Sequence, residues 1–434
     1  MSVRSRLFPA LAISALFGAA LPACAQTIQT YTSNDPALAL KQVSFEGGKT
    51  LDLSVGIGSG AFRRADEPDN LFWTISDRGP NFTCGDADSV IGIKGEQFCG
   101  EHAKKGRIYA TPDYSPTIYR IQVLDDGTFK VVEQIPLKDG KGQPIDGLLN
   151  PLTVASTEVP LDSKGQVLPQ NPSAVDAEGI VRLADGSFWI GEENGPSILH
   201  VGSDGRIQHR IVPAGTEKDY AGAGYEVVGG LPAILAKRAL NRGIESMALS
   251  ADEKFLFFVM QNPLANPDNT AYRTASNTRL FKFDRAAEKV VAEYVYELTP
   301  MSEFKGEEKK NANTARISEL TYLAGDKLLL LDRTERTTKL FEIDLAGATN
   351  ILGGKWDNLA TAPTLEQTAL AEAGIKPVAK RLVFDTTDRP ELPTKIEGVA
   401  RFADGSLMLI NDDDFGIEGA RTKVVKIRGL DLPR

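Results

Sequence analysis

Carboxylates stand at one fixed place in a pattern that repeats along the chain. One copy opens on Glu178 and, after an Asp-Gly turn, ends on Glu193; another opens on Glu397 and ends on Asp412. These two copies align without a gap from the glutamate onward. Further copies open on Glu245 and on Glu319, and a degenerate copy over 58–80 carries Ser59 in place of the glutamate. A carboxylate that recurs in this way can hold a metal or move a proton.

Each copy has the pattern of a β-hairpin, with two short apolar runs on either side of a turn. Because a hairpin brings its own start and end together, the opening glutamates and the closing polar residues should lie at the same end. Oxygen ligands at this density suit Ca²⁺ best, with Mg²⁺ and Mn²⁺ as the less favoured ions. The candidate catalytic residues, as base or metal holder, are Glu178, Glu245, Glu319 and Glu397. The candidate metal ligands are Asp77, Glu193, Asn194, Asn262, Asp332, Asp412 and Asp413.

Basic residues flank these carboxylates in the sequence. They are Arg78, Arg242, Arg316, Arg333 and Lys395, each within three positions of a candidate acid. A site with both a hard cation and guanidinium groups suits an anionic oxygen ligand such as phosphate. A structural interpretation stands beside this one, because a glutamate at a strand start can also cap its hairpin by pairing with backbone N–H groups or an arginine.

The elements that must position these residues are short strands. After most hairpins a third strand-like run follows, for example at 198–201 and 339–343, and a polar turn with a fourth run often comes next. Four short strands per unit, repeated around a ring, make a β-propeller blade. We count five such units, and the stretches 127–175 and 346–395 are long enough for a sixth. The sequence therefore predicts an all-β propeller of five or six four-stranded blades, forming one domain over 26–434.

The first 25 residues read as an export signal. Two arginines precede an apolar run, and small residues around Cys24 offer a cleavage site, or a poorer match to a lipid-attachment box. Cys84 and Cys99 remain in one polar, Gly-rich stretch, and in an oxidising compartment we expect them to form a disulfide. Beyond 1–25 we expect no membrane span. The net charge of −9 argues against nucleic acid as the partner and is compatible with hard cations.

With these residues in view, the chain resembles the phytase-like family also called "esterase-like activity of phytase". The stretches that carry the resemblance are Ser76–Asn81, Asp176–Ile180, Asn241–Leu249 with Met260–Leu264, and Lys395–Val399. The resemblance extends from about Gly58 to the C-terminus. It implies a periplasmic or secreted propeller in the phosphoester-hydrolase class, without assigning individual ligands.

Three functions fit these observations. The first is a Ca²⁺-dependent hydrolase of a small-molecule phosphate ester, with the arginines holding the phosphate. The second is a propeller that binds a ligand or partner without turnover. It would do so at the mouth, the end of the central channel where the opening glutamates and the closing polar residues meet. The third is a Ca²⁺-dependent lactonase or carboxylesterase.

Overall fold

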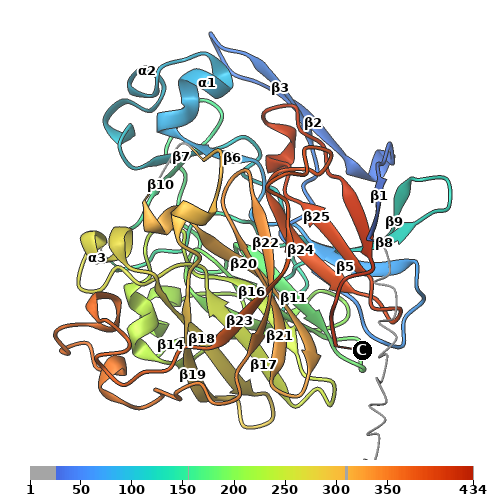
Figure 1. Cartoon of the computed structure of the whole chain (residues 1–434). Helices are drawn as coiled ribbons and strands as arrows, with labels where there is room; N and C mark the ends of the chain where they lie inside the picture. Colours follow the sequence, from blue (N-terminus) through green and yellow to red (C-terminus); the bar gives the residue numbers. More distant parts are fainter. Residues whose placement is uncertain (1–25, 155, 308–310, 434) are drawn as a thin grey trace, which may run out of the picture.

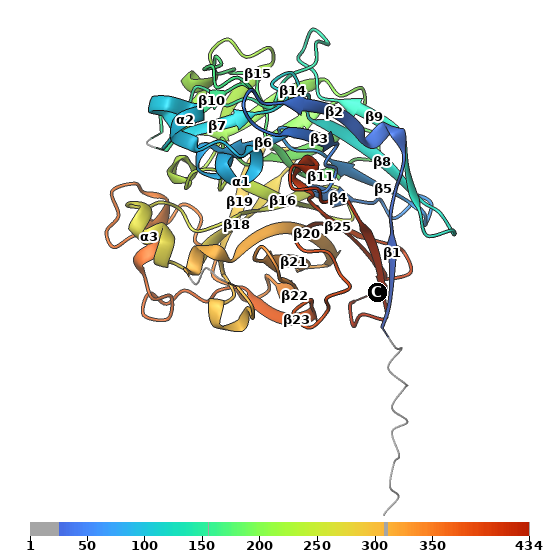
Figure 2. The same ribbon diagram turned by 90° about the horizontal axis from the view of Figure 1, so that it is seen from above.

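The computed structural model describes residues 26–154, 156–307 and 311–433. The signal peptide expected over 1–25, with its alternative lipid attachment at Cys24, lies outside these described residues. Five sheets of four or five strands surround a common axis (Figures 1 and 2).

Each sheet begins at the axis and runs outward in chain order, except that the fifth sheet ends on β1. The first sheet contains β4 (Gly60–Phe62), β5 (Leu71–Ile75), β8 (Thr117–Val123) and β9 (Phe129–Pro136). The second contains β11 (Ala177–Arg182), β12 (Phe188–Glu192), β13 (Ser197–Val201), β14 (Ile207–Pro213) and β15 (Glu226–Leu231). The third contains β16 (Ile244–Leu249), β17 (Phe255–Met260), β18 (Asn277–Asp284) and β19 (Lys289–Glu297). The fourth contains β20 (Arg316–Ala324), β21 (Lys327–Arg333), β22 (Thr338–Asp344) and β23 (Ala379–Asp385). The fifth contains β24 (Ile396–Arg401), β25 (Leu407–Asn411), β26 (Val424–Arg428) and β1 (Thr27–Tyr31).

The inner strands close into a ring, with β4, β11, β16, β20 and β24 each contacting the next and β24 contacting β4. Apolar clusters fill the space between neighbouring sheets. Trp189 of the second sheet packs with Phe258 of the third, and Phe72 of the first packs with Met408 of the fifth. The predicted all-β propeller is therefore the fold. In the described part of the stretches 127–175 and 346–395, the strands are β9, β10 and β23 rather than a further four-stranded sheet.

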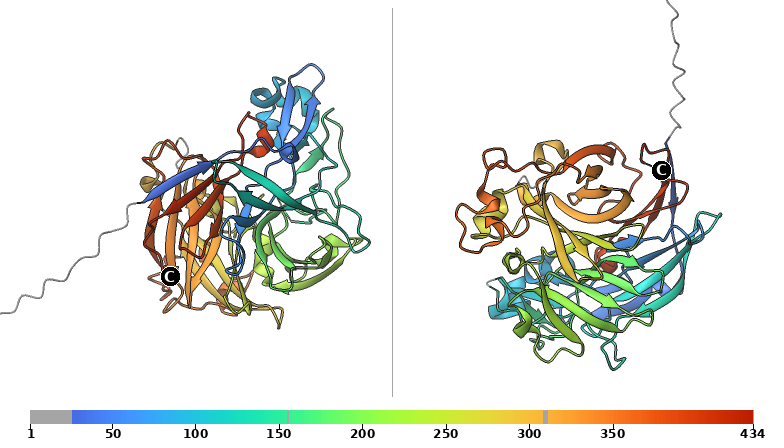
Figure 3. Two further views of the ribbon diagram at one scale, coloured as in Figure 1. Left: turned by 90° about the vertical axis from the view of Figure 1, so that its right-hand side faces the viewer. Right: turned by 90° about the horizontal axis from the view of Figure 1, so that it is seen from below.

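A smaller unit of the chain covers one end of the ring. It consists of the hairpin β2 (Ala39–Ser44) and β3 (Thr50–Ser54), the sheet β6 (Asn81–Thr83), β7 (Gly106–Tyr109) and β10 (Val159–Leu161), and the helices α1 (Ala87–Ile91) and α2 (Gly95–Cys99). We call it the cap; the left view of Figure 3 shows its blue hairpin and helices standing above the sheets. The predicted disulfide between Cys84 and Cys99 is present and joins the start of this helical segment to its end. A third helix, α3 (Asn269–Thr274), lies between β17 and β18. Within the described chain, every helix is too short or too polar to cross a membrane.

Candidate functional site

A register irregularity at the start of four inner strands sets the geometry of the site. In β16, Ile244 pairs with Met260 and Ser246 with Val259, so Glu245 is the extra residue. The equivalent shift in β11 includes Glu178, and in β24 it falls on Glu397. Because a bulge re-aims one side chain of a strand, these three glutamates are equivalent in the ring.

In the fourth sheet the same place belongs to Ser318 and not to Glu319. Ile317 pairs with Asp332 and Glu319 with Leu331, so the extra residue in β20 is Ser318. Successive side chains of a strand point to opposite sides, so Glu319 is directed away from the mouth. Its Oε2 accepts a hydrogen bond from the backbone N–H of Ala61 at 2.9 Å. The structure thus does not bring Glu319 together with the other three glutamates.

Glu319 is nearly fully buried, inside the ring of inner strands. Burial raises its pKa well above the ordinary value. Backbone N–H groups oppose this rise, and they come from Ala61, Leu320, Met247 and Val399. These residues belong to β4, β20, β16 and β24, so the carboxylate joins four inner strands to one another. This contact corresponds to the structural interpretation that the sequence left open for the glutamates.

The closing residues of the hairpins follow the same alternation. Glu192 and Asp332 pair with Ala177 and Ile317 at the strand ends and point away from the mouth. The carboxylate of Asp332 accepts hydrogen bonds from the Tyr296 hydroxyl at 3.1 Å and from the backbone N–H of Thr299 at 2.8 Å. The structure thus places Asp332 between strands, away from the glutamates. The next residue along each hairpin, Glu193 in the second sheet and Arg333 in the fourth, faces the mouth instead.

Three other predicted ligands lie beside the mouth and bond elsewhere. The Asn262 side chain donates to the backbone carbonyl of Ala315 at 2.7 Å. Asp413 accepts from the Thr422 hydroxyl at 3.2 Å, and burial raises its pKa to about 7. Asn194 is buried, and its backbone carbonyl accepts from Arg238. The structure therefore does not collect these three residues with the others.

An acidic cluster does form at the mouth. Asp77, Asp176 and Glu178 each offer a carboxylate oxygen, and these atoms lie within 4.8 Å of one another. Asp176 is 2% exposed, and neither of its oxygens accepts a hydrogen bond from the residues that the structure describes. The Arg78 guanidinium pairs with it, with Nη1 at 3.2 Å from Oδ2, and the charges of Arg78 and Arg107 oppose the rise in its pKa that burial causes. A buried carboxylate without donors is costly unless a cation neutralises it.

Repulsion within the mouth appears in the pKa values. Burial, followed by the nearby charges of Asp176, Glu193 and Glu245, raises the pKa of Glu178 well above its ordinary value. Burial, followed by the charges of Asp176 and Asp412, does the same to Asp77. On this side of the mouth, the carboxylates therefore carry more negative charge than the nearby basic residues neutralise.

Cations gather on the opposite side of the mouth. Arg333 donates from Nε to the Ser318 hydroxyl at 2.8 Å and from Nη2 to Glu397. The Ser318 hydroxyl in turn donates to Glu245 at 2.5 Å. Lys395 bridges Asp412 at 2.8 Å and Asp414 at 2.6 Å. This side is formed by the fourth and fifth sheets, whereas the acidic cluster belongs to the first and second.

Two further arginines connect the halves. Arg242 lies 3.3 Å from Glu193, and Arg316 pairs with Glu335. Burial, followed by the charge of Arg333, lowers the pKa of Arg316. The Nε atoms of Arg242 and Arg316 are buried and have no hydrogen-bond partner among the described residues. Guanidinium groups held close together in this way attract an anion.

Several residues of the site are not among the site residues predicted from the sequence. These are Asp176, Asn241, Ser318, Glu335 and Asp414, which bond to the predicted residues or complete the acidic cluster. One signal could have revealed Asp176. It stands two positions before Glu178, the same offset that separates Lys395 from Glu397 and Arg316 from Ser318.

The cap is attached directly to the mouth, because Asp77 and Arg78 lie between β5 and β6. A loop also covers this point: a Cβ on Gly147 would lie 2.2 Å from the backbone of Arg78. Only glycine permits such a close approach. Arg78 is consequently only 4% exposed although it belongs to a loop.

Comparisons with known proteins give a family model and a secreted relative. Residues 100–415 match the model of a phytase-like family described as "esterase-like activity of phytase". An uncharacterized secreted protein of Arthroderma benhamiae is 27% identical over 175 residues, which are 37% of this chain. The chain spans 34% of the length of that relative.

Solved structures that align with most of the chain share little sequence with it. The WD40 repeats of RRP9 align over 92% of this chain and 99% of theirs, with 10% identity and a TM-score of 0.35. Virginiamycin B lyase from Staphylococcus aureus aligns over 93% of this chain and 99% of its own, with 11% identity and a TM-score of 0.32.

Proposed function

Since the chain belongs to the phytase-like family described as "esterase-like activity of phytase", we propose that it is an exported, cation-dependent phosphoesterase. The observation that carries the proposal is the divided mouth. On one side three carboxylates lie within 4.8 Å of one another, and Asp176 among them accepts no hydrogen bond from the described residues; Arg242 and Arg316, each with a buried Nε that has no partner in the described chain, connect this side to the other. A bound cation would neutralise the carboxylates, and a bound phosphate group would accept hydrogen bonds from the arginines.

The acidic cluster fits a hard divalent cation, with Ca²⁺ as our first choice and Mg²⁺ or Mn²⁺ as alternatives. Asp77, Asp176 and Glu178 would hold it, and Glu193 is close enough to add its charge to theirs. The fit rests on Asp176, whose two buried oxygens accept no hydrogen bond from the described residues. When bound, such a cation polarises a phosphoryl oxygen and lowers the pKa of a water molecule beside it.

The basic residues of the chain would bind and orient the phosphate. Arg242 and Arg316 each have a buried Nε with no partner in the described chain. Arg333 is held by Ser318 and Glu397, which fixes the plane of its guanidinium. Positioning of this kind, with charge directed at the phosphate oxygens, accounts for most of the catalysis in phosphoryl transfer.

Glu245 is the best-placed proton acceptor. Its charge acts on Glu178 and Glu193 on the acidic side and on Arg333 and Glu397 on the basic side, so it stands between the halves. Its contact with the Ser318 hydroxyl orients the carboxylate. A carboxylate between a cation site and a phosphate site can accept a proton from the attacking water.

The test is a dye-release assay with a phosphomonoester, a phosphodiester and a carboxylester, each with added Ca²⁺ and with chelator. We expect Ca²⁺-dependent release from a phosphate ester and a loss of at least about a hundredfold in Glu245→Gln and Glu397→Gln. Asp252→Asn and Asp404→Asn are matched controls, because both residues lie in turns at the far end of the same hairpins and should leave activity unchanged.

The other outcomes identify other functions. Release from the carboxylester alone would replace the proposal with the esterase that the family description names. No release from any of the three substrates would favour a propeller that binds without turnover. Equal losses in all four variants would show that the glutamates act on stability and not on chemistry.

A further inference from the structure

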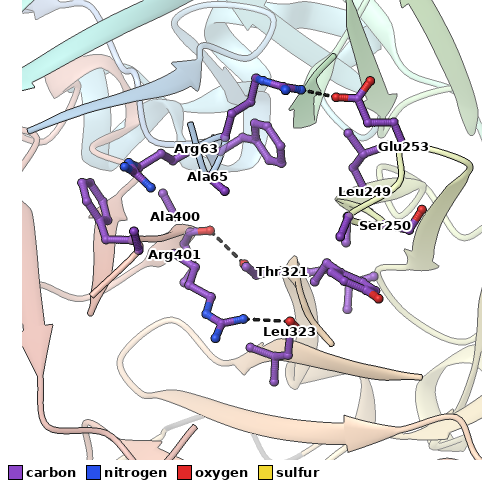
Figure 4. Close-up of a pocket in the computed structure, with 18 of the residues that line it drawn as sticks. Arg63, Ala65, Leu249, Ser250, Glu253, Thr321, Leu323, Ala400 and Arg401 are labelled. Carbon is purple, nitrogen blue, oxygen red and sulfur yellow. Dashed lines mark hydrogen bonds and ion pairs between the residues drawn. The ribbon is translucent and has the colours of Figure 1, made fainter. Parts of the chain in front are cut away.

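The opposite end of the ring contains a cavity of about 410 Å³, remote from the acidic cluster (Figure 4). It is surrounded by the far ends of the inner strands β16, β20 and β24 and by the chain that follows β4. Its apolar lining includes Phe62, Ala248, Leu249, Leu323 and Phe402. A cavity of this size with an apolar wall and a few polar groups is typical of small-molecule sites.

Three arginines line this cavity, and two of them are neutralised. Arg64 pairs with Asp66 at 3.0 Å and with Glu253. Arg63 pairs with Asp69 at 2.8 Å and stacks on the ring of Phe402. The charges of Arg63 and Arg64 are therefore neutralised by carboxylates of the protein itself.

Arg401 is different. Its Nη1 donates to the backbone carbonyl of Leu323 at 2.9 Å, as Figure 4 shows, and its Nη2 donates to the carbonyl of Pro433. No carboxylate of the described chain pairs with it, and burial lowers its pKa without an opposing acidic charge. Two carbonyls leave part of the guanidinium fork unused, and a guanidinium in a partly desolvated site binds a carboxylate strongly.

We propose that this cavity binds a small anion with an apolar tail, of the alkyl carboxylate class. The carboxylate would pair with Arg401, and the tail would lie along Leu249, Leu323 and Phe402. A cationic ligand would meet Arg401 with a like charge, and a neutral one would leave the guanidinium unpaired. The inference is independent of the chemistry proposed for the other mouth.

The experiment measures displacement of 1-anilinonaphthalene-8-sulfonate, a fluorescent apolar anion, from the full-length folded protein. We expect octanoate to displace the probe and octylammonium to leave it in place. Arg401→Gln should weaken octanoate binding about tenfold or more, since a charge-assisted contact is lost. Arg206→Gln is the matched control, because Arg206 is an exposed turn arginine of the second sheet paired with Asp204.

A second pair of variants tests the proposal independently, in case Arg401→Gln does not fold. Ala251 and Ala403 line the cavity from exposed turns, so Ala251→Trp and Ala403→Trp should fill it without disturbing the core. We expect both to abolish octanoate binding and to keep the melting temperature. Binding that is unchanged in the tryptophan variants, or equal for octanoate and octylammonium, would overturn the proposal.

Discussion

Asp176 is the carboxylate of the mouth for which the described residues supply no hydrogen-bond donor. Its carboxylate is buried beside two others and has Arg78 as its nearby cation. We predict that Ca²⁺ stabilises the protein, by about 2.7 kcal/mol at a hundredfold excess over Kd. Asp176→Asn should remove most of this gain, which thermal melts with Ca²⁺ and with chelator will measure.

The control for this variant is Asp404→Asn, which changes a carboxylate already satisfied by Ser406 in an exposed turn. It should retain the full Ca²⁺-dependent shift. A melting curve of the unsubstituted protein that does not respond to Ca²⁺ would instead show that arginines alone neutralise the mouth.

The raised pKa values of Asp77 and Glu178 predict a pH dependence. A carboxyl whose pKa is raised on folding stabilises the protein fully below the ordinary carboxyl range of about pH 4, and this contribution is lost as pH rises toward the raised value. Ca²⁺ must displace these protons, so its stabilising effect should grow as pH rises. Melting temperatures with Ca²⁺ and with chelator at several pH values between about 5 and 8 will show whether the difference widens; a constant difference contradicts the prediction.

Glu319 should behave unlike its sequence neighbours in the repeat. Replacing it with glutamine puts an amide N–H₂ among backbone N–H groups, and we expect a loss of about 1–3 kcal/mol in the free energy of unfolding. The loss should be independent of Ca²⁺, because the carboxylate lies inside the ring and not at the mouth. Urea unfolding with and without Ca²⁺ measures the loss and its dependence on Ca²⁺. A loss that depends on Ca²⁺ would show that Glu319 belongs to the metal site after all.

At the scale of single residues, the sequence predicted Asp77, Glu178, Glu193, Glu245 and Glu397 at one mouth, because the repeat preserves their spacing. It failed at the fourth copy, where glutamate occurs one position later. A bulge decides which of two adjacent residues faces the mouth, and the apolar pattern on either side is the same for both choices.

At the scale of elements, the cap depends on a covalent link between its ends. Cys84 and Cys99 are 15 residues apart, and closing a loop of this length stabilises a fold by about 3 kcal/mol. The cap has its own apolar cluster, formed by residues such as Phe45, Phe82 and Ile91, apart from the clusters between the sheets. We therefore predict that the Cys84→Ser, Cys99→Ser double variant loosens the cap before the ring unfolds.

Hydrogen exchange measured by mass spectrometry can separate the two units. Amides over 81–109 should lose protection in the double variant, while those of β16 and β17 keep it. Uniform loss over both regions would mean that the cap and the ring unfold together. Thiol titration of the denatured, unreduced protein checks that the pair is oxidised at the start.

At the scale of the whole molecule, the ring is closed by strands from opposite ends of the chain. Gln29 of β1 pairs with Lys426 of β26. We predict that Gln29→Pro, which cannot donate to this ladder, lowers the free energy of unfolding of the entire ring by on the order of 2 kcal/mol. The comparison is Lys41→Pro, opposite Leu53 in the β2–β3 hairpin of the cap, which should have a smaller effect on urea unfolding.

The propeller could be predicted because each blade repeats the same hairpin, and repetition survives the divergence of single residues. The closing strand could not, because Thr27–Tyr31 is a short polar run without the repeat. Its role depends on a partner about 400 residues away, and spacing alone does not identify such partners.

The pairing of β1 with β26 also sets an order of events in time. A ribosome makes Thr27–Tyr31 before the strands of the first four sheets and Val424–Arg428 after them, so β1 waits without its partner while those sheets are completed. Until β26 has been made, the fifth sheet offers an open edge, and such edges invite pairing with other chains. If the chain crosses a membrane from its N-terminal side, as the export signal predicted over 1–25 would direct, the ring closes only after Val424–Arg428 has crossed.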